Sequence, residues 1–169
     1  MGRNGKVDYR AILELRDTIE KNLTGKELQS FIDSCAKELA ARLLAKVVKR
    51  TPVGDYSGDS YTCATGKTHK GRKVSGKTGG TLRRGWTAGK KPTPFAQELK
   101  VRHLGKTYVI EIVNPVEYAN YVEYGHRTRN GGWVEGHFML TISEEEIQRD
   151  APRVLENKLK KKLGDIFNG

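Results

Sequence analysis

The pattern of apolar and polar positions predicts two long amphipathic helices, one toward each end of the chain. The first begins after Thr24 and ends before Pro52, with apolar residues three or four positions apart between Leu28 and Val47. Thr24 and Glu27 have the spacing of a capping box, and Pro52 disfavours helical geometry in the residue before it. This helix therefore has one apolar face to bury.

The second helix is predicted from Ser143 onward, because Ser143 and Glu146 repeat the capping-box spacing. Apolar positions continue along one face from Ile147 to Ile166. Pro152 lies inside this pattern and lacks a backbone N–H, so we expect it to kink or divide the helix.

Between the helices the period shortens and predicts β-structure. Residues 95–103 and 107–114 indicate two strands of an antiparallel hairpin, and residues 82–86 indicate a short strand-like piece. Residues 118–124 fit a short helix or bent segment ended by Gly125, with its tyrosines packed on the sheet, and residues 126–136 fit a turn. The prediction is an α+β fold, a small antiparallel β-sheet packed against a long N-terminal helix and a C-terminal helix.

Residues 54–80 interrupt this plan with a long inserted loop rich in Gly, Ser, Thr and Lys. Such a segment buries too little apolar surface to offset its ordering entropy, so we expect it to be flexible. The length of 169 residues suits one domain, 1–169, that carries this loop as an insertion.

Positive charge is concentrated in one segment. The chain has a net charge of +11, and residues 66–106 hold twelve Lys or Arg against the single acid Glu98, so the remainder sums to about zero. A cluster of this kind attracts polyanions such as nucleic acid, although a solvated loop needs no partner. The candidate residues for contact with nucleic acid or a partner protein are Lys67, Lys70, Arg72, Lys73, Lys77, Arg83, Arg84, Lys90 and Lys91.

Residues 71–78, GRKVSGKT, match the nucleotide-binding pattern G-x-x-x-x-G-K-[ST]. That loop needs a buried strand before it and a helix after it, which together direct backbone N–H groups at the phosphates. No apolar strand is predicted before Gly71, and Gly79-Gly80 is a poor helix start. We interpret the match as chance and expect no cofactor.

The best candidate for catalysis is a metal site formed by Glu123, His126, Glu135 and His137, as a nuclease would need. Their spacing fits neither the HExxH helix nor a cysteine knuckle, so exposed turn histidines are the preferred interpretation and no enzyme is expected. Chain-wide signals favour the cytosol: the two cysteines have no disulfide or CxxC spacing, and neither a signal peptide nor a membrane-spanning run is seen.

Four short motifs occur in a fixed order along the chain. They are Thr51-Pro52-Val53, then the segment TGGTLRRG at 78–85, then YANYVEYG at 118–125, and finally GHFML at 136–140. This order resembles the tailed-bacteriophage neck and tail-completion (head-tail connector) family named for the tenth gene product of a lambdoid coliphage. The resemblance covers residues 27–165, and the matching positions are Thr51, Pro52, Gly80, Leu82, Arg83, Tyr118, Ala119, Tyr121, Val122, Glu123 and Gly125.

The resemblance implies a virion protein without catalytic activity, assembled in the host bacterial cytoplasm into a homo-oligomeric, six-fold ring at the head-proximal end of the tail. Its partners would be other neck and tail proteins, with sequence-independent contact between the basic loop and DNA or an adjacent ring, and no membrane. Two departures are the insertion of about 25 residues after Val53 and Gly136-His137 in place of a proline. The alternatives are a free basic nucleic-acid-binding module and a metal-dependent nuclease. The particular ring, the type of tail and the host stay open.

Overall fold

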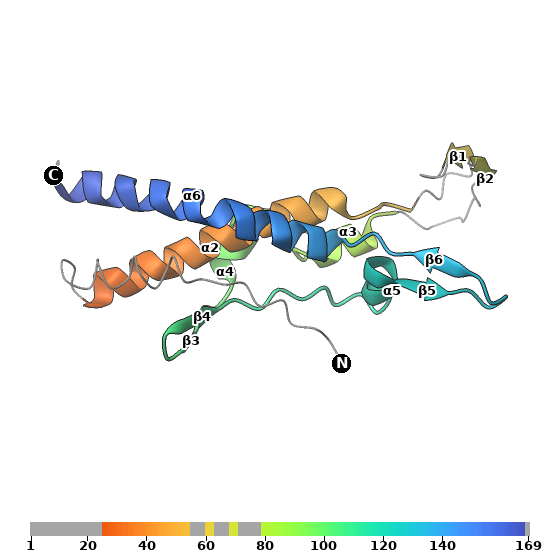
Figure 1. Cartoon of the computed structure of the whole chain (residues 1–169), viewed down its shortest axis with the longest axis horizontal. Helices are drawn as coiled ribbons and strands as arrows, with labels where there is room; N and C mark the ends of the chain where they lie inside the picture. The colour runs from red at the N-terminus through yellow and green to blue at the C-terminus, as the bar shows by residue number, and fades with distance from the viewer. Residues whose placement is uncertain (1–24, 55–59, 63–67, 71–78, 168–169) are drawn as a thin grey trace.

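Two long helices, α2 (Gly25–Arg50) and α6 (Met139–Phe167), form the body of the protein. The computed structural model describes residues 25–54, 60–62, 68–70 and 79–167. Figure 1 shows α2 and α6 crossing along the long axis of the molecule, with the shorter elements gathered against and beyond them. The predicted α+β class with N- and C-terminal helices is confirmed, and α2 ends directly before Thr51-Pro52 as predicted. Thr24 lies outside the described residues.

The apolar face of α2 is buried in two successive clusters. Its first half packs against α6, through Leu28, Phe31, Ile32, Cys35 and Leu39 on α2 and Ile147, Ala151 and Leu155 on α6. Its second half packs against the chain that follows, through Ala40, Ala41, Leu44, Val47, Leu82, Trp86, Ala96 and Met139. One helix thus organises both parts of the core, which is what the long apolar stripe predicts.

Two predicted strand segments are helical instead. Residues 81–85 form α3 (Thr81–Gly85), and residues 92–98 form α4 (Pro92–Glu98), so the strand predicted from residue 95 begins too early. Leu82 and Trp86 are four residues apart and both buried, a spacing that lies on one face of a helix and equally on one face of a strand, so the pattern does not distinguish the two. Proline at the first position of a helix removes a donor that has no partner there, so Pro92 starts α4 without penalty.

The strands form three separate antiparallel ribbons of two strands each within the described residues. Their bounds are β1 (Ser60–Thr62) with β2 (Thr68–Lys70), β3 (Arg102–Leu104) with β4 (Thr107–Val109), and β5 (Gly125–Arg127) with β6 (Trp133–Glu135). The predicted hairpin and its turn at residues 104–106 are confirmed as β3–β4, although shorter than expected. Two segments predicted as irregular contain the other ribbons, because strands of three residues are too short to show the alternation that sequence reading requires.

The start of α6 differs from the prediction, and of the two effects predicted for Pro152, a kink or a division of the helix, the division does not occur. The helix begins at Met139, so Ser143 is not its cap: the Ser143 hydroxyl lies inside the helix and donates to the Met139 carbonyl over 2.6 Å. The helix also continues through Pro152 without dividing. Pro152 and Gln148, whose carbonyl loses its donor, are both exposed, so water can satisfy that carbonyl.

Candidate assembly surface

The motif at residues 118–125 forms α5 (Ala119–Tyr124), which was predicted as a short helix, and Gly125 follows it. Ala119 and Val122 are partly buried and pack against the second core cluster. Glu123 beside them is also directed inward and is 5% exposed. One side of α5 is therefore fixed to the body of the protein.

Glu123 provides the cap for the N-terminus of α6. Its carboxylate accepts hydrogen bonds from the backbone N–H groups of Leu140 and Thr141 and from the Thr141 hydroxyl, each over 2.9 Å. The first N–H groups of a helix have no partner within the helix, and the helix dipole favours a negative charge there. Sequence reading missed this role because the capping residue lies sixteen positions before the helix rather than next to it.

The charge of Glu123 also affects Glu144 in the first turns of α6. Burial raises the pKa of the Glu144 carboxyl, and the negative charge of Glu123 raises it further. Two acids close to one helix start therefore have different roles: Glu123 is held by three donors, whereas Glu144 is more easily protonated than an exposed glutamate.

The opposite side of α5 is an exposed aromatic surface. Tyr118, Tyr121 and Tyr124 are three positions apart and 46%, 59% and 51% exposed. The prediction that these tyrosines pack on a sheet is therefore wrong. Trp133 and Phe138, in the chain that follows α5, are also 55% and 40% exposed, and we call these five exposed residues the aromatic face.

The chain that follows β6 is held against α5 by two backbone hydrogen bonds. The backbone N–H groups of His137 and Phe138 donate to the carbonyls of Val122 and Glu123 over 2.8 and 3.0 Å. Gly125 has a φ of +83°, and a side chain there would meet the backbone of β6 and the Trp133 ring. Only glycine adopts this conformation at little cost, which explains the residue that ends the motif.

The first two motifs meet at Thr51, which is fully buried. Its hydroxyl donates to the Val47 carbonyl over 2.7 Å and accepts the indole N–H of Trp86 over 2.8 Å. Its carbonyl accepts two hydrogen bonds from the guanidinium of Arg83, over 2.6 and 3.1 Å. Gly80, with a φ of +91°, precedes α3 and places Leu82 in the core. These motif residues join α2 to α3.

Several of the candidate basic residues have partners within the chain. Arg83 is bound to Thr51, Arg84 donates to the Gly79 carbonyl over 3.1 Å, and Lys90 pairs with Glu98 over 2.5 Å. Lys91 is exposed at the start of α4. Lys70 ends β2, and Lys67, Arg72, Lys73 and Lys77 lie outside the described residues. Contact between these residues and DNA or a partner stays a prediction.

Two other sites were considered from the sequence, a nucleotide-binding loop at residues 71–78 and a metal site of a nuclease. Residues 71–78 lie outside the described residues. The preceding element, β2, is a strand, but it is polar, three residues long and part of an antiparallel ribbon. The next described helix, α3, has five residues. Among the described residues, no group of three or more His, Cys, Asp or Glu side chains is placed to hold a metal. Glu123 is engaged at α6, and His126 stacks edge-on against Tyr121 with ring centroids 5.6 Å apart.

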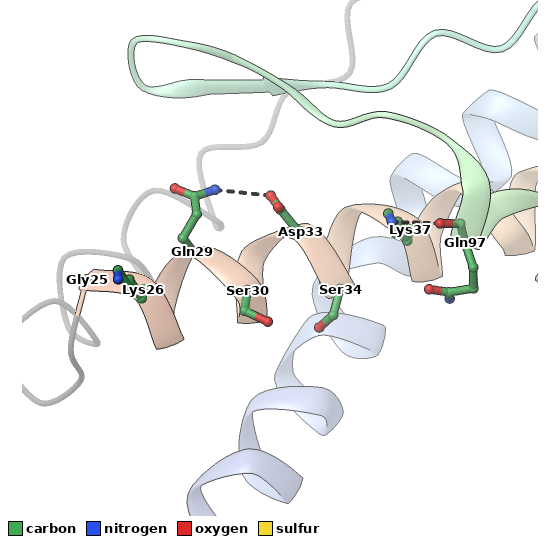
Figure 2. Close-up of a pocket in the computed structure, with 8 residues that line it drawn as sticks. All are labelled: Gly25, Lys26, Gln29, Ser30, Asp33, Ser34, Lys37 and Gln97. Carbon is green, nitrogen blue, oxygen red and sulfur yellow. Dashed lines mark hydrogen bonds between the residues drawn. The ribbon is translucent and has the colours of Figure 1, made fainter.

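A polar hollow lies beside the N-terminal half of α2, and Figure 2 shows the residues that line it. It is open to solvent, has a volume of about 660 Å³ and is lined by Gly25, Lys26, Gln29, Ser30, Asp33, Ser34, Lys37 and Gln97. Its polar groups bind one another: Gln29 donates to Asp33 over 3.1 Å, and Lys37 donates to the Gln97 carbonyl over 2.7 Å. This arrangement leaves few convergent groups for a small ligand.

Comparison with known proteins agrees with the motifs. Residues 14–125, most of the chain, match the family described as "Bacteriophage HK97-gp10, putative tail-component". The chain belongs to this family of phage tail components. The comparison with curated proteins found no match, and neither did the comparison with solved structures. In the part of the chain that the structure describes, no helix is long and apolar enough to cross a membrane.

Proposed function

We propose that this protein is a structural subunit of the phage virion that assembles into a homo-oligomeric ring, six-fold in symmetry, at the head-proximal end of the tail, and that it catalyses no reaction. Membership of a family of tail components supports the virion location and contacts with other tail proteins. The ring would complete the tail and join it to the head.

The observation that carries this proposal is the aromatic face. Exposed aromatic side chains gathered on one surface are typical of a protein-protein contact, because tyrosine and tryptophan bury large areas with little loss of side-chain entropy. The same motif that exposes Tyr118, Tyr121 and Tyr124 also caps α6 through Glu123. A rigid body therefore presents this surface, which favours a defined contact in an assembly.

The positive segment has a secondary role in the proposal. In a ring around the DNA passage, Lys91 and the basic residues around β1–β2 would face the DNA or an adjacent ring. Phosphate contacts of this kind are independent of sequence and weaken as salt rises. A free nucleic-acid-binding module is the second candidate, and the +11 charge of residues 66–106 is the observation that favours it.

The experiment is to withhold the subunit during phage assembly and image the products by electron microscopy. A nonsense mutation that removes the protein should leave filled heads and separate tails, and supplying the wild-type chain from a plasmid should restore joined particles. As a control, a plasmid that supplies the Glu145→Gln chain, changed at an exposed position of α6, should restore them equally well. Normal joined virions in the complete absence of the subunit would contradict the proposed function.

A further inference from the structure

The residue directly before α6, Phe138, has a left-handed backbone conformation. Its φ is +46°, and among the described residues Ala88 is the only other non-glycine residue with a positive φ. A left-handed conformation brings the Cβ atom close to the following carbonyl oxygen, so it is strained for a residue with a bulky side chain. Glycine has no Cβ atom and adopts the same conformation freely. The chain therefore has a large aromatic residue at a position that glycine would occupy at lower energy.

Glu123 holds the backbone on both sides of Phe138. Its carbonyl accepts the Phe138 N–H over 3.0 Å, and its carboxylate accepts the N–H groups of Leu140 and Thr141 over 2.9 Å each. The Phe138 carbonyl in turn accepts the N–H of Ile142, in the first turn of α6, over 3.0 Å. A strained residue persists only where the surrounding structure determines its conformation. None of these bonds uses the Phe138 side chain, so they hold the backbone in this conformation whatever residue is present.

The Phe138 side chain is not part of the buried core. It is 40% exposed, whereas the buried members of the two core clusters are at most 8% exposed. Strained backbone positions are concentrated at sites that contact ligands or partners, where the strain is part of the function. An exposed aromatic side chain on a strained backbone therefore indicates a contact residue rather than a residue of the core.

We propose that Phe138 anchors the contact between neighbouring copies of this chain, and that the free subunit loses stability in order to present this side chain. This inference rests on the proposed ring and names one residue that carries its contact. Protein-protein contacts depend most on a few large side chains at rigid positions, because such side chains lose little entropy when they bind. The backbone bonds around Phe138 give its side chain a position of this kind. A neighbouring copy that buries the side chain would offset the strain.

Two substitutions at position 138 separate the backbone strain from the side chain. Phe138→Ala and Phe138→Gly both remove the aromatic side chain, but only glycine relieves the left-handed backbone. The glycine variant should therefore unfold at a temperature about 2–4 °C higher than the alanine variant, measured by circular dichroism at a concentration where both are monomeric. The same pair of substitutions at Glu145, an exposed position of α6, should show the opposite order, because glycine weakens a helix. Equal stabilities at position 138, or a more stable alanine variant, would overturn the strain.

Light scattering of the same variants, across a range of concentrations, tests the contact. Phe138→Gly and Phe138→Ala should each raise the concentration needed for assembly roughly tenfold or more, the loss expected when a central aromatic contact is removed. Phe138→Tyr keeps an aromatic side chain and should assemble as the wild type does.

Assembly of Phe138→Gly at the wild-type concentration would overturn the contact between copies and leave the proposed ring intact. If that variant also failed to restore joined particles in phage, Phe138 would be assigned to a contact with another tail protein. A wild-type chain that is monomeric at every concentration would contradict both the contact and the proposed ring.

Discussion

At the scale of single residues, Glu123 gives the motif at residues 118–125 a structural role, which is to cap the N-terminus of α6. Its carboxylate joins α5 to α6 through three hydrogen bonds, while the tyrosines beside it are exposed. The position of the aromatic face relative to the long helix therefore depends on one buried side chain.

We expect Glu123→Ala to lower the free energy of unfolding by about 1–3 kcal/mol, the cost of leaving buried amide donors without an acceptor. Urea denaturation followed by circular dichroism measures this change. Glu123→Gln retains one acceptor oxygen and should lose less. Equal stability of the alanine variant and the wild type would show that the cap does not support α6.

Glu144 predicts a pH dependence of stability. Because burial and Glu123 raise its pKa above the ordinary 4.5, its ionised form opposes folding at neutral pH. We expect Glu144→Gln to be more stable than the wild type at pH 7, and the difference to shrink as the pH falls through the raised pKa toward 4.5 and below. Parallel denaturation series of the two proteins check this. A difference that grows as the pH falls would contradict the assignment.

At the scale of elements, the junction of α2 and α3 depends on Thr51, a residue of the first motif that binds Arg83 inside the second motif and Trp86 directly after it. Its hydroxyl is the acceptor for the buried indole of Trp86, and its carbonyl is the acceptor for Arg83. The motif Thr51-Pro52-Val53 thus has two structural roles. Pro52 ends α2, and Thr51 accepts hydrogen bonds from Arg83 and Trp86 in and after α3.

Replacing Thr51 with Val tests this junction, because the new side chain has a similar shape but leaves the Trp86 indole N–H without an acceptor. The expected loss is about 1–3 kcal/mol in the free energy of unfolding. Tryptophan fluorescence during guanidinium denaturation measures it. Thr51→Ser keeps the hydroxyl and should lie closer to the wild type. If valine and serine behaved alike, the hydrogen bond to Trp86 would not be the cause.

Long elements could be predicted from the sequence, whereas several short elements could not. The apolar stripe of α2 repeats over many turns and ends at Pro52, so its bounds were predictable. The segments α3 and α4 have five and seven residues, too few to distinguish a helical period from a strand period. The cap of α6 joins residues distant in sequence, and the exposure of the tyrosines depends on the placement of β6, so neither was readable from local pattern.

At the scale of the whole molecule, charge is unevenly distributed along the chain. Residues 66–106 carry a charge of +11, whereas the charged residues from Thr107 to Gly125 are the acids Glu111, Glu117 and Glu123. The ribbon β1–β2, within the basic segment, lies apart from α5 (Figure 1). In the proposed ring, a neighbouring copy would cover the exposed aromatic residues of α5.

The mass of the purified chain in solution, measured by light scattering across a range of concentrations, tests this account most directly. The wild type should reach the mass of six chains. The variant Tyr121→Ser/Tyr124→Ser, which removes two exposed rings and keeps the Glu123 cap, should stay monomeric and keep the helical circular dichroism of the wild type, although the ring contact between Tyr121 and His126 is lost. Equal masses for wild type and variant, whether both are hexamers or both are monomers, would contradict the claim that the aromatic face builds the ring.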